Sequence, residues 1–133
     1  MEPLMRYIAR TSRCASIYRG KAFNKLEINE YQHPYIICIC QNPGINQEQI
    51  SNEIFVNKSN VTRQLTALEQ KKLIYRIPSI TDKRVVNVYP TEKAIQILPK
   101  IKTVLKEWNE KIIEDLKENE KESILLIMKK VQA

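Results

Sequence analysis

Residues 57–71 have the sequence NKSNVTRQLTALEQK, and this stretch decides the fold. Val61, Leu65 and Leu68 recur at the spacing of one helix face, so we predict a helix over about 58–71 that buries them. Asn57 precedes this helix, and asparagine is a favoured N-cap residue. Short polar side chains and arginine at a helix start suit base edges and phosphates in a major groove. Our candidate DNA-binding residues here are Lys58, Ser59, Asn60, Thr62, Arg63 and Thr66.

A shorter helix should precede this one. Asn46 and Gln49 have the spacing of a capping box, and Ile50 and Ile54 would face inward. The gap at about 55–57 fits a helix-turn-helix. Upstream, we expect a buried helix from about His33 to the turn at 42–44, because Pro34 is tolerated only in a first helical turn. This region is therefore predicted to be a compact group of helices.

A hairpin should follow the 58–71 helix, because the apolar period changes there from about four residues to two. Two β-rich runs, 73–78 and 85–90, flank the polar stretch 79–84. Lys83 and Arg84 at the tip are further candidates for DNA contact, and Asp82 could orient Arg84 by a charge-assisted hydrogen bond. A hairpin directly behind a helix-turn-helix is the arrangement of a winged helix.

Both ends of the chain should be helical. We predict a first helix over about 3–23, a long helix starting after Thr91, and a last helix capped by Asn119 with Glu122 after a linker at 117–121. The apolar faces of these helices are too large for a monomer. The expected fold class is mainly α with a small β-hairpin wing. We expect one winged-helix domain over 1–133, with a DNA-binding core at about 33–90 and dimerisation helices at about 1–25 and 92–133.

Composition narrows the function. The 133-residue chain has a net charge of +7, and the segment 57–84 holds seven basic residues against two acidic ones. Two glycines and one histidine leave no phosphate-binding glycine loop and little for histidine-based catalysis or zinc binding. We therefore expect no enzyme activity, no cofactor and no metal. The chain has no long apolar run and no signal segment at its start, so a cytoplasmic location is expected.

Cysteines and tyrosines leave alternatives open. Cys14 has arginine neighbours that favour a thiolate, so it is a candidate redox residue, although structural thiols are the commoner case. His33 should serve in capping or packing. Four tyrosines could line a ligand pocket or belong to the core: Tyr7, Tyr18, Tyr31 and Tyr35.

These motifs together resemble the MarR-type (multiple antibiotic resistance regulator) winged-helix transcription factors. Residues 43–50 are similar to the family's turn into its third helix, 57–63 to the start of its recognition helix and 68–74 to its exit. Asp82-Lys83-Arg84 matches the family's Asp-x-Arg wing, and 91–94 the start of its long helix. The family often has glycine where Lys72 stands, so the recognition helix is expected to end differently here.

The resemblance implies a homodimer on a pseudo-palindromic operator, commonly acting as a repressor. Many relatives release DNA when a small aromatic or lipophilic ligand binds or a cysteine is oxidised. We therefore expect a ligand-responsive repressor that binds specific sequences of double-stranded DNA. The alternative is a winged-helix interaction module whose basic face binds an acidic protein; it should bind DNA only weakly, in a salt-labile manner and without sequence preference.

Overall fold

The structure, a computed structural model, describes residues 3–132. Its helices and strands follow the predicted order closely. They are α1 (Leu4–Lys25), α2 (His33–Gln41), β1 (Ile45–Asn46), α3 (Gln47–Ile54), α4 (Lys58–Gln70), β2 (Ile74–Pro78), β3 (Val86–Pro90), α5 (Glu92–Ile112) and α6 (Glu118–Gln132). The predicted fold class, a helical chain with a small β wing, is confirmed.

The sheet has three strands in the order β1-β3-β2, all antiparallel. The hairpin register pairs Tyr75 with Tyr89 and Arg76 with Val88. The short β1 pairs Ile45 with Val88 from the other side, and this strand was not predicted. It joins the turn before α3 to the base of the hairpin. Strand β3 thus pairs with β2 along one edge and with β1 along the other, which fixes the wing to the helix-turn-helix.

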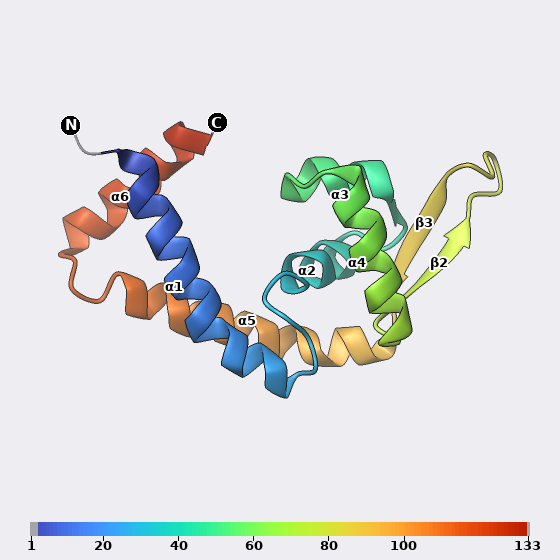
Figure 1. Ribbon diagram of the computed structural model, residues 1–133, viewed down its shortest axis with the longest axis horizontal. Helices are drawn as coiled ribbons and strands as arrows, with labels where there is room; N and C mark the ends of the chain where they lie inside the picture. Colours follow the sequence, from blue (N-terminus) through green and yellow to red (C-terminus); the bar gives the residue numbers. More distant parts are fainter. Residues whose placement is uncertain (1–2, 133) are drawn as a thin grey trace.

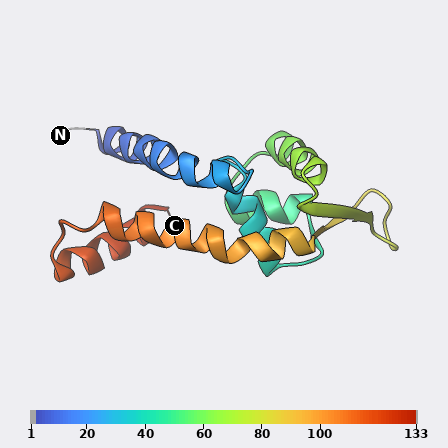
Figure 2. The ribbon, with the colours of Figure 1, turned by 90° about the horizontal axis from the view of Figure 1, so that it is seen from below.

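Two regions are distinct in the ribbon. The head, residues 28–90, holds α2, α3, α4 and the sheet, with the hairpin projecting from it (Figure 1). The arm consists of α1, the later part of α5, and α6, and the start of α1 and the end of α6 lie at its far end (Figure 1). Seen from below, α1 and α4 lie on one side of the molecule and α5 on the other (Figure 2). The arm helices α1 and α5 pack on each other.

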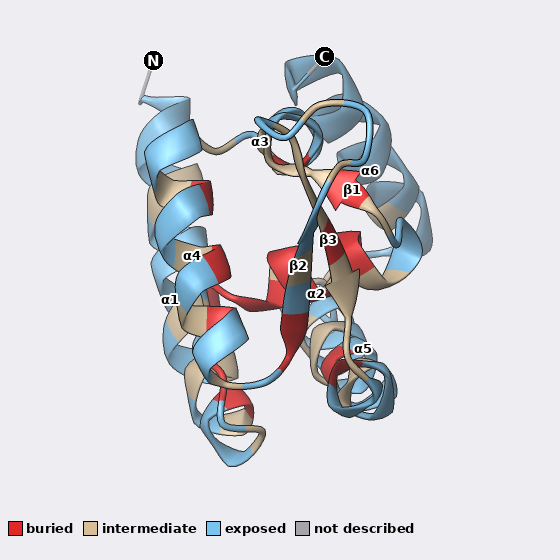
Figure 3. Cartoon of the chain, turned by 90° about the vertical axis from the view of Figure 1, so that its right-hand side faces the viewer, coloured by how far each residue is buried: buried red, intermediate tan, exposed pale blue. Residues whose placement is uncertain are grey.

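The core lies in the head and at the base of the arm. It includes Phe23 of α1, Ile39 of α2, Leu65 of α4, Val88 of β3 and Ile101 of α5, all completely buried. By contrast, none of the described residues of α6 is buried, and this helix is mostly exposed (Figure 3). Among the residues that the structure describes, no helix is long and apolar enough to cross a bilayer.

Side-chain caps fix the starts of three helices, and two of these caps, Asn46 and Asn57, were predicted. Asn46 and Gln49 form a complete capping box, with reciprocal bonds of 2.9 and 3.0 Å. The Asn57 Oδ1 accepts the backbone N–H of Asn60 at 2.7 Å, which sets the first turn of α4. Thr91 caps α5 through the N–H of Ala94. These bonds satisfy N–H groups that a helix start otherwise leaves unpaired.

The predicted start of the last helix was wrong. The helix α6 begins at Glu118, so Asn119 lies inside it and the connection spans 113–117 instead of 117–121. The Glu120 carboxylate accepts the backbone N–H of Lys117 at 2.9 Å. Acidic residues in the first turn also suit the positive end of the helix dipole. Glu120 thus does what the sequence analysis assigned to Glu122.

The end of α4 has the geometry of a Schellman motif. Lys72 takes the left-handed conformation, with φ of 61°. Its N–H bonds to the Glu69 carbonyl, and the Leu73 N–H bonds to the Leu68 carbonyl, both at 3.0 Å. The expectation of a different ending was therefore wrong, because lysine occupies the conformation that glycine favours.

Candidate nucleic-acid interface

The outer face of α4 carries most of the candidate residues. Val61, Leu65 and Leu68 are completely buried beneath it, whereas Lys58, Ser59, Thr62, Arg63 and Thr66 are exposed. The threonine hydroxyls donate to the carbonyls one turn earlier, each at 3.0 Å. Lys58 and Arg63 form no salt bridge with any residue of 3–132. This face therefore presents two uncompensated cations among short polar groups.

Asn60 differs from its neighbours because it is partly buried. Its Oδ1 accepts a hydrogen bond from the hydroxyl of Tyr35 on α2. Burial raises the pKa of this phenol, so it remains a protonated donor. From the sequence, Tyr35 was expected in a ligand pocket or in the core; its bond to Asn60 was not predicted, since nothing local signals a contact across this separation along the chain.

At the wing tip, Asp82 and Arg84 are bonded as the sequence analysis expected. The Asp82 carboxylate accepts the backbone N–H of Arg84 at 3.0 Å and its guanidinium at 3.2 and 3.4 Å. The backbone N–H and then the guanidinium lower the pKa of Asp82, so this carboxylate is charged near neutral pH. Lys83 beside them is exposed. The tip therefore holds two cations, one of them oriented by a carboxylate.

The wing and the start of α4 meet at one hollow of about 180 Å³. Lys58 lines it from α4 and Arg84 from the wing, and the remaining lining residues are Asn46, Gln47, Glu48, Val85 and Val86. Two cationic residues far apart in the sequence are thus brought together. An arrangement of this kind suits a phosphate of a nucleic-acid backbone.

A bidentate ion pair holds the wing against α4. Arg76 of β2 donates from Nε and from an Nη atom to the two carboxylate oxygens of Glu69, both at 3.1 Å. The hydrogen bond from Arg76 lowers the pKa of Glu69. Arg76 therefore contributes to positioning, and its charge is already compensated.

The four candidate pocket tyrosines do not converge. Tyr31 and Tyr35 line a cleft of about 370 Å³ between α1, the start of α2 and α4. Tyr18 lines another cleft, of about 540 Å³, with Cys14 and Trp108, and its ring lies 4.9 Å from the Trp108 ring. Tyr7 lines neither of these two clefts. The structure thus brings together only one pair of the four.

The tyrosine cleft contains a polar cluster. Arg19 of α1 forms an ion pair with Glu30, although the Arg19 Nε and one Glu30 oxygen are buried without a partner in the described chain. Burial raises the pKa of Glu30 despite the neighbouring charge of Arg19. His33 stacks on Phe23, and its Nδ1 lies 2.6 Å from the Glu30 carbonyl oxygen. Burial lowers the pKa of His33 to about 4, so the ring is neutral at pH 7.

The cysteines are separated. Cys14 is exposed on α1, whereas Cys38 is buried and Cys40 partly so. Burial raises the pKa of both α2 thiols, which makes them poor nucleophiles. Within residues 3–132, no group of three His, Cys, Asp or Glu side chains is placed to hold a metal ion.

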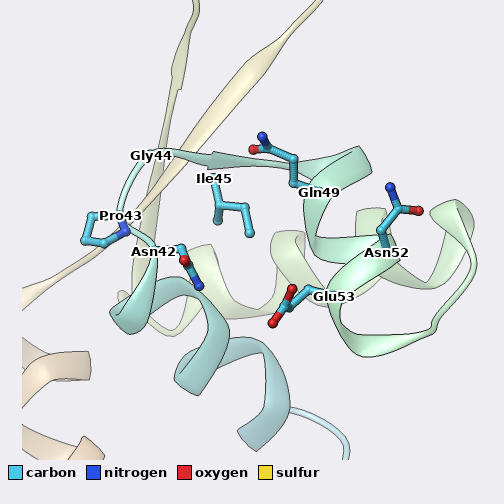
Figure 4. A pocket seen from close by; sticks show the side chains of 7 residues that line it. All are labelled: Asn42, Pro43, Gly44, Ile45, Gln49, Asn52 and Glu53. Carbon is cyan, nitrogen blue, oxygen red and sulfur yellow. The ribbon is translucent and has the colours of Figure 1, made fainter. Parts of the chain in front are cut away.

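A polar cleft of about 560 Å³ lies away from α4, between the end of α2 and α3. Its lining includes Asn42, Gln49, Asn52 and Glu53, with Glu53 directed into the hollow (Figure 4). Because no lysine or arginine lines it, this cleft lacks the charge that a phosphate requires.

Comparison with known proteins finds relatives of one family. The MarR family model matches residues 28–86. Over this segment, the chain is similar to the MarR family. It is 26% identical over 132 residues to the HTH-type transcriptional regulator YybA of Bacillus subtilis, covering 99% of this chain and 88% of that protein.

Solved structures of MarR-family proteins are similar throughout. The transcriptional regulator SlyA superposes with a TM-score of 0.92 at 26% identity, covering 97% of this chain and 91% of that one. A putative MarR-family regulator from Listeria monocytogenes, solved with 26mer DNA, gives a TM-score of 0.91 at 26% identity, covering 99% and 88%.

These likenesses identify a DNA-binding transcriptional regulator and not an enzyme. The protein-interaction alternative gains no support from these comparisons. The matched segment, 28–86, contains every candidate residue on α4 and the wing, as well as Tyr31 and Tyr35. Tyr7, Tyr18 and Cys14 lie outside it.

Proposed function

We propose that this chain is a homodimeric repressor that binds a pseudo-palindromic operator. The head, with its core at about 33–90, binds the DNA, while the helices at about 1–25 and 92–133 form the dimer. The convergence of Lys58 and Arg84 on one hollow beside the exposed face of α4 carries this proposal. It lets α4 enter a major groove while the wing contacts the flanking backbone or minor groove.

Each candidate has a proposed role. Arg63, Asn60 and Ser59 reach base edges; Lys58, Thr62 and Thr66 contact phosphates or sugars near the same groove. Lys83 and Arg84 bind beside the wing, and Asp82 holds Arg84 in position. The partner is double-stranded DNA, and no cofactor or membrane takes part. A regulator of this kind works where the chromosome lies, so we place it in the cytoplasm.

A titration of DNA from upstream of its own gene, at fixed salt, tests the proposal. Arg63→Ala should lower affinity for that DNA by about tenfold and weaken discrimination against scrambled sequence. Lys58→Ala should weaken binding to both DNAs alike and reduce the salt dependence by about one phosphate contact. Lys106→Ala, an exposed lysine on α5, is the control for charge alone. Equal affinity for both DNAs in the unmodified protein contradicts the proposal.

Repression is tested in cells with a reporter behind the same upstream DNA. Deleting the gene should raise reporter expression, and the Arg63→Ala variant should fail to restore repression. A fall in expression on deletion would identify an activator instead.

We place a small aromatic or lipophilic effector in the cleft of Tyr31 and Tyr35. This cleft adjoins both α1 of the arm and Asn60 of α4, so an occupant touches the two regions at once. A panel of small aromatic compounds should include one that releases DNA from the unmodified protein, and Tyr31→Ala should reduce its effect. Oxidation of exposed Cys14 is a second means of release; Cys14→Ser then abolishes sensitivity to peroxide.

A further inference from the structure

The hydrogen bond between Tyr35 and Asn60 joins a core residue to the outer face of α4, which carries the candidate DNA-binding residues. Tyr35 is only 2% exposed and belongs to the hydrophobic core, as does the next residue of α2, Ile36. Asn60 lies in the first turn of α4, where its backbone N–H is held by Asn57. Both partners are therefore fixed, the phenol by packing and the asparagine by the helix cap.

The bond determines what Asn60 can offer to a base. An asparagine amide has one acceptor oxygen and two N–H donors. The phenol of Tyr35 donates to the Oδ1, while the Nδ2 group makes no hydrogen bond to another residue among 3–132. Both N–H donors of this amide are thus free, whereas its oxygen has already accepted one hydrogen bond and keeps one of its two lone pairs.

A free asparagine reads adenine with both sides of its amide. The oxygen accepts from adenine N6 while the nitrogen donates to N7. The bond to buried Tyr35 holds this oxygen toward α2, so the amide is poorly placed for this pairing. Its free N–H groups suit bases that present acceptors: guanine offers both O6 and N7 and thymine offers O4, whereas adenine offers N7 beside an N6 donor.

We propose that Tyr35 is a specificity-determining residue that holds the amide oxygen of Asn60 away from the bases and presents its N–H donors, selecting guanine or thymine over adenine at one position of each half-site. The proposal rests on the proposed function, in which α4 lies in the major groove. Tyr35 itself touches no DNA; it acts through the orientation of Asn60.

Selection of bound sequences from a randomised DNA library tests this. The unmodified protein should enrich guanine or thymine at the Asn60 position. Tyr35→Phe removes only the hydroxyl, which frees the Oδ1, so the relative preference for adenine at that position should rise roughly fivefold or more. Other positions of the motif should stay unchanged. Relative preference among sequences does not depend on how much of a variant is folded, so a loss of stability does not obscure the result.

Two further variants complete the design. Tyr75→Phe is the matched control, because Tyr75 on β2 stacks on Tyr89 and its hydroxyl bonds to no residue of 3–132; its motif should equal that of the unmodified protein. In an Asn60→Ala background, Tyr35→Phe should no longer shift any base preference. A shift that persists without Asn60 overturns the inference.

The results distinguish a failure of the proposed DNA-binding function from a failure of the role proposed for Tyr35. If the unmodified protein enriches no motif, sequence-specific binding fails, and the inference fails with it. If it enriches a motif that Tyr35→Phe leaves identical, the proposed function stands and the role of Tyr35 is overturned.

Discussion

Lys72 holds a backbone conformation that costs a side chain with a Cβ about 1 kcal/mol relative to glycine. Lys72→Gly should therefore raise the free energy of unfolding by about 1 kcal/mol, which for a domain of this size corresponds to roughly 3–5 °C in Tm. Urea and thermal unfolding followed by circular dichroism measure the change. Lys72→Ala, which keeps the Cβ, is the control and should gain little. Equal stability of the glycine and alanine variants would contradict the assignment of strain.

His33 should stay neutral well below the usual range of histidine. Burial lowers its pKa from 6.5 to about 4, so between these values the unfolded chain binds a proton that the folded chain does not. The stability that His33 contributes is thus fully present above pH 6.5 and is lost as the pH falls toward 4, by about 2–3 kcal/mol in all.

The measurement is direct, because the chain has one histidine and its imidazole NMR signals need no assignment. His33→Gln keeps a donor for the Glu30 carbonyl without the titration, and unfolding of this variant should lose the corresponding pH dependence between 4 and 6.5. An observed pKa near 6.5 would show that the ring is open to solvent.

At the scale of single residues, contacts within one helix turn could be predicted from the sequence, whereas contacts between packed elements could not. Asn57 and Asn46 were predicted as caps because a cap acts within three residues. The bonds of Asn60 to Tyr35 and of Arg76 to Glu69 depend on how elements pack, and no local pattern encodes them. Seven basic residues in 57–84 looked equivalent in the sequence. In the structure, Arg76 is paired and Lys71 donates to buried Gln32 at 2.8 Å, which leaves fewer cations for DNA.

At the scale of elements, the cap of α4 serves both folding and the proposed DNA binding. The Asn57 side chain accepts from the Asn60 N–H and from the Ser59 hydroxyl. Asn57→Ala should lower the free energy of unfolding by about 1 kcal/mol. Asn57→Asp caps equally well, so it should keep the stability, yet its negative charge at the phosphate-facing end should lower DNA affinity.

Denaturant unfolding and a DNA titration on the same three proteins separate these effects. Asn52→Ala, at an exposed position of α3, serves as the control for loss of an amide. Unchanged DNA affinity in Asn57→Asp would argue against placing this helix start near phosphates.

Elements with strong local signals were predicted to within one or two residues, as for α2, α3 and the hairpin. The two-residue β1 was missed, because its only signal is pairing with β3, far along the chain. The start of α6 was misplaced because Asn119 and Glu122 have capping-box spacing, while Glu120 also lies three residues after Lys117. Both pairs have the three-residue spacing of a capping box, so spacing alone does not decide which pair starts the helix.

For the whole molecule, the exposed arm is the feature that favours a dimer. The helix α6 leaves a group of apolar side chains in solvent, which a lone chain would seldom tolerate; they are Ile124, Leu125, Leu126, Ile127, Met128 and Val131. Ile127→Glu should therefore convert the dimer to a monomer and lower operator affinity at least tenfold, because two linked heads bind better than one.

Light scattering after size exclusion measures the mass, and a DNA titration measures the affinity. Ile95→Glu is the matched control, since Ile95 is about equally exposed but lies near the start of α5, where that helix follows β3 of the head. A dimer that survives Ile127→Glu with full affinity, or an unmodified protein that is monomeric, would contradict the arrangement.

The junction of α4 and α5 has a mechanical consequence. The Thr91 hydroxyl donates to the Lys72 carbonyl at 2.7 Å, and Lys93 donates to the Lys71 carbonyl at 3.1 Å. The last turn of α4 is thereby bonded to the first turn of α5, a helix about 30 Å long. If α5 tilts by about 10° about its far end, α4 moves by about 5 Å, which is more than the rise of one base pair. In the proposed dimer, the angle at which the arms of the two protomers cross would then determine which spacing of operator half-sites the protein accepts.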